Sequence, residues 1–76
     1  MDAQKLVRMA NEIAAFFASE PDRAVAIDSV ASHLRRFWEP RMRRELLVWL
    51  DQHAGEGLSA LALDTLKERR SEIAPR

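Results

Sequence analysis

The chain of 76 residues contains no cysteine, no tyrosine and only two glycines. Without cysteine it can form no disulfide and has no thiolate ligand for a zinc ion or an iron–sulfur cluster. Gly55 and Gly57 are not followed by a lysine near the start of a helix, so there is no glycine-rich loop for a phosphate group. His33 and His53 are far apart, and neither belongs to a His-x-x-x-His or Glu-x-x-His pair. We therefore expect no metal site and no cofactor held by this chain.

The chain also has no excess of charge of one sign and no long apolar run. Twelve basic and twelve acidic residues give a formal net charge of zero, whereas nucleic-acid-binding domains usually carry a clear basic excess. No stretch approaches the roughly 20 apolar residues that a membrane-spanning helix needs. Asp2, Lys5 and Arg8 interrupt the N-terminal region, which therefore does not resemble a signal peptide. These features predict a cytoplasmic protein with no membrane partner and no nucleic-acid partner.

Apolar residues recur at three- to four-residue spacing along the chain, which is typical of amphipathic helices. Pro21, Pro40 and the segment 54–57 interrupt the pattern, because proline disfavours helix at the preceding residue and glycine often ends a helix in the left-handed conformation. No run alternates apolar and polar residues as a strand does. The sequence predicts an all-α fold in one domain, residues 1–76. This fold is a small compact bundle of three to four short helices at about residues 3–19, 22–38, 40–53 and 59–72, followed by a frayed tail at 73–76.

Local signals indicate helix ends and a core. Asp2 and Ser19 are the predicted caps of the first two helices, and Gly55 is predicted to close the third. Ser59 either caps the last helix or lies inside it. Asn11 is expected to face solvent, with a hydrogen bond across a helix contact as the alternative. The predicted core consists of Leu6, Ile13, Phe16, Val30, Leu34, Phe37 and Leu50.

The segment 33–44, HLRRFWEPRMRR, surrounds the helix break at Pro40. It holds five of the twelve basic side chains and a single acid, Glu39. Trp38 lies at the break, where it either closes the end of the bundle or projects into a partner. Arginine and tryptophan are over-represented among the residues that dominate binding energy at interfaces. We therefore predict a partner-binding surface formed by Arg35, Arg36, Trp38, Arg41 and Arg43.

Catalysis by this chain alone is not expected. None of its serines, nor Thr65, has a recognisable activating neighbour, and a chain this short has little room to enclose a ligand pocket of several hundred Å³. A domain of this size buries only about 60% of the surface that its unfolded chain exposes, so its core is marginal. Some of its stability is therefore expected to come from a partner.

Two blocks carry a family resemblance: KLVRMANEIAAFF at residues 5–17 and HLRRFWEPRMR at residues 33–43. Together with the spacing between them and the glycine-containing loop after the third helix, they resemble the delta subunit of the soluble NAD-dependent formate dehydrogenases of bacteria. The resemblance covers about residues 4–66. It offers no catalytic residue to assign to this chain.

The resemblance implies a non-catalytic accessory subunit of a cytoplasmic complex that oxidises formate to carbon dioxide and reduces NAD⁺. In that complex the larger subunits hold a molybdenum or tungsten pterin cofactor, iron–sulfur clusters and a flavin. The implied partners are these larger subunits, the catalytic one first, which the small subunit would stabilise or help to assemble. A transient assembly factor is the alternative, and a small helical nucleic-acid-binding protein is a remote one. The isolated chain is also a candidate for self-association.

Overall fold

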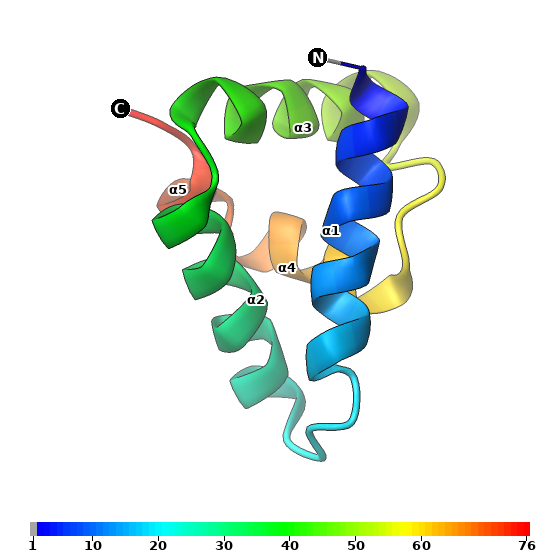
Figure 1. The fold of residues 1–76 in the computed structure, drawn as a ribbon, viewed down its shortest axis with the longest axis vertical. Coiled ribbons are helices and arrows are strands. Elements are labelled where there is room, and N and C mark those ends of the chain that lie inside the picture. Colours follow the sequence, from blue (N-terminus) through cyan, green and yellow to red (C-terminus); the bar gives the residue numbers. More distant parts are fainter. Residues whose placement is uncertain (1) are drawn as a thin grey trace.

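The computed structural model describes residues 2–76, in which five helices follow one another and no strand occurs. The predicted all-α bundle is therefore confirmed. Helices α1 and α2 lie side by side and run antiparallel, α3 crosses their upper ends, and α4 packs behind them (Figure 1). The helices span Ala3–Phe17 (α1), Arg23–Phe37 (α2), Pro40–His53 (α3), Ala60–Glu68 (α4) and Arg70–Ile73 (α5).

Short polar side chains fix where three of the helices begin. The Asp2 side chain accepts a hydrogen bond from the backbone amide of Gln4, and the Ser59 side chain accepts one from the amide of Ala62. The second helix is capped by Asp22 and not by the predicted Ser19. The reason is that α1 already ends at Phe17, and Ser19 lies in the turn that leads to Pro21. Ser59 is thus a cap and not an interior residue.

The core lies where α1, α2, α3 and α4 converge. Leu6, Val30, Leu34 and Leu50 are buried there, whereas Ile13 is only partly buried at its edge. Phe16 and Phe37, predicted as core residues, are instead 78% and 70% exposed. The other buried apolar residues are Val7, Ala10, Ala14, Ala26, Ile27, Ala31, Trp38, Leu46, Leu47, Leu61, Ala62, Leu66 and Ile73.

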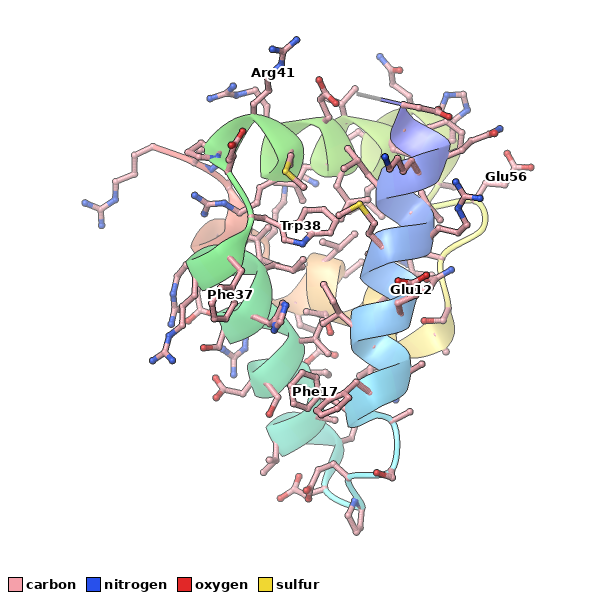
Figure 2. The ribbon with its side chains drawn as sticks, viewed as in Figure 1. Glu12, Phe17, Phe37, Trp38, Arg41 and Glu56 are labelled. Atoms are coloured by element: carbon pink, nitrogen blue, oxygen red, sulfur yellow. The ribbon has the colours of Figure 1, made fainter. Side chains whose placement is uncertain are left out.

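Trp38 closes one end of this core. It follows the last residue of α2 and has extended backbone, with φ −93° and ψ 133°. Its side chain turns in between α1 and α2 and is only 6% exposed, while the ring of Phe37 stays outside beside His33, at a centroid distance of 4.8 Å (Figure 2). Trp38 was expected either to close the end of the bundle or to project into a partner, and the structure shows that it closes the bundle. Because the indole fills this end of the core, Phe37 is left outside.

The predicted last helix, 59–72, is broken in two. Arg69 has non-helical backbone (φ −117°, ψ 26°), and the chain turns there into the short helix α5. The turn brings Ile73 into the core, where it is completely buried. The prediction that residues 73–76 fray is therefore wrong at Ile73. This residue packs in the core, and its carbonyl oxygen accepts a hydrogen bond from Arg43 Nη1 at 3.1 Å.

The loop between α3 and α4 is held by side chains from two helices. Asn11 Nδ2 donates to the carbonyl oxygen of Gly57, and Asn11 Oδ1 accepts from the amide of Ser59, both at 2.9 Å. Trp49 Nε1 donates to the carbonyl oxygen of Glu56 at 2.8 Å. Asn11 thus bonds across elements, but to the loop before α4 and not across the helix–helix contact that was the alternative to solvent exposure.

Left-handed backbone carries the chain out of α3. The prediction that Gly55 closes α3 is only partly right, because Ala54 is the C-cap and already adopts φ 54°, with φ 71° at Gly55 after it. The positive φ favours glycine at position 55, and a Cβ atom there would also lie 2.6 Å from Leu63 Cδ1, so the end of that leucine side chain would have to shift. The bonds that Asn11 and Trp49 make to this loop offset the roughly 1–2 kcal/mol that a left-handed alanine costs.

Ion pairs join α5 to the rest of the bundle. Arg70 binds Asp51 of α3 through two hydrogen bonds of 2.8 and 2.6 Å, and Arg69 bonds to Asp28 of α2 at 3.1 Å. The hydrogen bonds and positive charge of Arg70 lower the pKa of Asp51 below its ordinary value of 3.8, while Asp51 raises the pKa of Arg70. None of the described helices is long and apolar enough to cross a membrane.

We predict that Trp38→Ala destabilises the fold strongly and that Phe37→Ala hardly changes its stability, although the residues are adjacent. Removing a buried tryptophan side chain typically costs about 3–5 kcal/mol, which is a large share of the stability of a domain this small. Removing an exposed side chain usually changes stability by less than about 0.5 kcal/mol. Urea unfolding followed by circular dichroism should show a large loss of stability for Trp38→Ala only. Equal losses would contradict the assigned positions.

We predict that Asn11→Ala lowers the free energy of unfolding by about 1–2 kcal/mol, because two hydrogen bonds to the loop are lost. The matched control is Gln52→Ala, which removes an exposed amide side chain from α3. Thermal unfolding of both variants measures the difference. A loss in the control as large as that in Asn11→Ala would show that the loop contacts contribute nothing.

The lowered pKa of Asp51 predicts a pH dependence. Because Asp51 is easier to ionise in the folded chain, its ion pair stabilises the fold above the unfolded pKa, near 3.8, and this contribution is lost as the pH falls through the folded value. Asp51→Asn should therefore lose stability at pH 7 and show a shallower acid-induced loss than the unsubstituted chain. Glu68→Gln, an exposed acid outside any ion pair of the described residues, is the control.

Candidate subunit interface

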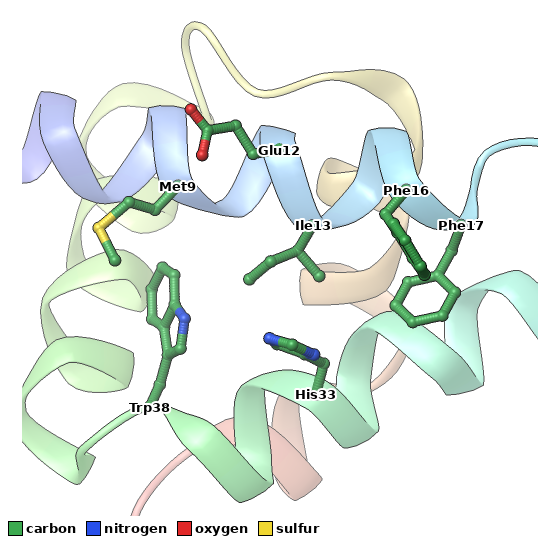
Figure 3. Close-up of a pocket in the computed structure, with 7 residues that line it drawn as sticks. All are labelled: Met9, Glu12, Ile13, Phe16, Phe17, His33 and Trp38. Atoms are coloured by element: carbon green, nitrogen blue, oxygen red, sulfur yellow. The ribbon is translucent and has the colours of Figure 1, made fainter.

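A groove runs along the surface between α1 and α2. Met9, Ile13 and Phe17 of α1 form its floor and one wall, and His33 and Trp38 stand opposite (Figure 3). Its volume is about 430 Å³. Apart from Glu12 and His33, the side chains that line it are apolar, so water in the groove has few polar partners. A surface of this kind favours an apolar occupant.

Phe16 lies at one end of the groove and is 78% exposed. Its ring meets that of Phe17 edge to face, with centroids 5.1 Å apart. A helix turns by about 100° per residue, so two adjacent phenylalanines cannot both face the core. Phe17 continues the inward stripe of Leu6 and Ala10, which leaves Phe16 on the rim of the groove. This is the physical reason why the core prediction for Phe16 is wrong.

A second, smaller hollow continues the groove along α2. It shares Phe17 and His33 with the groove and extends to Phe37, which is 70% exposed. Asp28 and Arg36 mark its two ends. Together, the groove and this hollow form one surface, which we call the α1–α2 face.

The five residues predicted to bind a partner do not form one surface. Arg35 lies within 3.9 Å of Glu72, and Arg35 and Arg43 border a hollow beside α5. Arg36 lies on the α1–α2 face instead, because neighbouring residues of a helix project in directions about 100° apart. Trp38 forms a wall of the groove from within the core.

The predicted arginines differ in how far contacts within the bundle already occupy their side chains. Arg41 points away from the bundle with a side chain that is 79% exposed, and its Nε lies 3.5 Å from Glu45 (Figure 2). Arg43 is held by its bond to the Ile73 carbonyl group, and its buried Nε has no hydrogen-bond partner. No ion pair of the described residues involves Arg36. Arg36 and Arg41 are therefore the most available of the predicted set.

Sequence reasoning did not identify the groove, since Met9, Phe17 and His33, which line it, were not among the predicted partner-binding residues. The usable signal was the Phe16-Phe17 pair, because one of two adjacent aromatic residues on a helix must leave the core. Within residues 2–76, no three His, Cys, Asp or Glu residues form a group that could hold a metal ion. His53 packs against Trp49 with ring centroids 4.1 Å apart.

Comparison with known proteins agrees with the two sequence blocks. The model of the family described as NADH-dependant formate dehydrogenase delta subunit FdsD matches residues 5–66. No curated protein and no solved structure matches the chain. The matched segment contains both blocks and extends from the first turn of α1 into α4. Because the match spans most of the 76 residues, the chain belongs to the family of delta subunits of NADH-dependent formate dehydrogenase.

Proposed function

We propose that this chain is a non-catalytic subunit that docks on the larger subunits of a cytoplasmic NAD-dependent formate dehydrogenase and stabilises the complex. Family membership implies association with other subunits of such an enzyme. The observation that carries the docking role is the α1–α2 face, where Phe16 and Phe37 are exposed beside an apolar groove. Exposed apolar patches of this kind mark surfaces that bind other proteins.

Formate oxidation and NAD⁺ reduction are assigned in this proposal to the other subunits, with the catalytic subunit as the first candidate for the partner. The charges of the face support a protein partner over a nucleic acid. Glu12, which lines the groove, would repel phosphate groups, while Arg36 at one end of the face is balanced by Asp28 at the other. In this proposal the larger subunits hold the cofactors of the enzyme, and this chain holds none.

The proposal is tested by purifying the tagged chain from its own cells and assaying formate-dependent NAD⁺ reduction in the eluate. Activity that co-elutes with the chain at a fixed ratio supports a resident subunit. An eluate with inactive catalytic subunit that lacks its cofactor would instead identify a transient assembly factor. Elution without any formate dehydrogenase subunit would overturn both roles.

We predict that Arg36→Ala combined with Arg41→Ala weakens this association by about tenfold or more, if each arginine contributes as interface arginines commonly do. Both side chains are exposed, so helix content should not change. The control is Lys67→Ala, which removes an exposed charge from α4. Unchanged recovery of the complex with the double variant would exclude these arginines from the interface.

A further inference from the structure

The C-terminal segment, residues 69–76, is bent away from α4 at a single residue. Arg69 has φ −117° and ψ 26°, whereas the backbone of an α-helix lies at about −63° and −42°, so the regular helical hydrogen bonds cannot run through it. The next four residues are helical again and form α5. Two helices thus follow one another with one non-helical residue between them, and the second returns to the core (Figure 1).

The local sequence does not favour this bend. Between Ala60 and Ala74 there is no proline and no glycine, and the segment around the bend reads KERRSE, residues 67–72. Lysine, glutamate and arginine are among the best helix-forming residues, and serine ranks only moderately lower. Local preference alone would therefore continue α4 as one helix to residue 73. Only Glu68 and Glu72, a like-charge pair at i,i+4, weakly oppose that straight helix.

Tertiary contacts hold the bend, and one side chain dominates them. Ile73 is completely buried, and its carbonyl oxygen accepts the hydrogen bond from Arg43 Nη1. Arg70 is paired with Asp51, but these two side chains are 46% and 55% exposed. Exposed ion pairs contribute little to stability, whereas the burial of a large apolar side chain contributes much more. Ile73 is therefore the main anchor of the segment.

Two features of the closed arrangement work against this anchor. The bend at Arg69 gives up the helical hydrogen bonds that a continuous helix would form there. In addition, Arg43 Nε is buried without a hydrogen-bond partner, next to the bond that Arg43 makes to the segment, and an unsatisfied buried donor is unfavourable. When one anchor is set against such opposing terms, a segment can open separately from the rest of a fold.

We propose that the C-terminal segment has two positions. In the closed position, which the structure shows, Arg69 is bent and Ile73 fills the core beside α2 and α4. In the open position Ile73 leaves the core, α4 continues as one straight helix to residue 73, and the part of the core that Ile73 covers becomes exposed. The family match ends at residue 66, so this element lies outside the segment on which the proposed function rests.

Thiol labelling of the full chain tests whether the segment opens separately. Because the chain has no cysteine, Ile73→Cys introduces a single thiol at the anchor. The matched control is Val30→Cys, since Val30 is equally buried but lies in the middle of α2. We expect alkylation under native conditions to be at least about tenfold faster at position 73 than at position 30. Equal rates would mean that Ile73 becomes accessible only when the whole bundle unfolds, and would overturn the proposal.

NMR spectroscopy of the full chain tests the form of the open position. Ile73→Asn removes the apolar anchor, and Val48→Asn makes a similar change at an exposed position of α3. In Ile73→Asn, we expect the Cα chemical shift of Arg69 to become helical. We also expect a contact between the Leu66 Hα and the Arg70 amide proton, which a continuous helix brings together. Val48→Asn should keep the non-helical shift at Arg69.

Two NMR results would contradict the straight helix. Random-coil shifts from residue 69 onward in Ile73→Asn would show a frayed end instead of a second helical position. A bend at Arg69 that survives the substitution would show that Ile73 does not hold it. If Ile73→Asn does not fold, Ile73→Ala, which keeps a small apolar side chain, takes its place with the same measurements. Unfolding of both variants would place Ile73 in the same cooperative unit as the rest of the core and would also overturn the proposal.

Discussion

The burial of Trp38 determines how the two halves of the molecule meet. Its backbone leaves the helical conformation directly after α2, and its indole fills the end of the core before Pro40 starts α3. Because the chain has only two residues in which to turn, the indole is at once the closing residue of the core and a wall of the groove. The same turn leaves Phe37 and Arg36 on the outside. The exposed aromatic surface is thus a direct consequence of which of two adjacent rings is buried.

The rest of the bundle is tied together by contacts between segments that are far apart in sequence. Asn11 joins α1 to the loop before α4, and Ile73 inserts into the core from the last short helix. Arg70 and Asp51 connect that helix to α3. Exposed ion pairs such as this one contribute little individually, so the burial of Ile73 is the main reason that the C-terminal segment packs.

Much of the fold could be predicted, because periodicity, Pro21, Pro40 and the glycine loop are local signals. The features that were missed depend on tertiary contacts. No proline or glycine marks the break at Arg69, which exists because Ile73 gains burial when the chain turns there. The site was predicted as one basic corner, but Arg35 and Arg36 point to different surfaces of α2, and composition alone cannot divide a cluster in this way. Family membership could be predicted from the two sequence blocks. The groove could not, because its lining depends on which residues of α1 and α2 face the space between the two helices.

The open α1–α2 face follows from how the helices are arranged. With α4 on one side of the α1–α2 pair and α3 across its end, no helix within residues 2–76 covers the other side. A partner that binds only the folded chain stabilises it by mass action, in proportion to the logarithm of its concentration relative to the dissociation constant. A chain with a small core and no disulfide of its own can therefore draw stability from the surface that is proposed for docking. Under the proposed function, assembly completes folding: the partner covers the exposed aromatic groove, and its binding adds the stability that the marginal core does not supply.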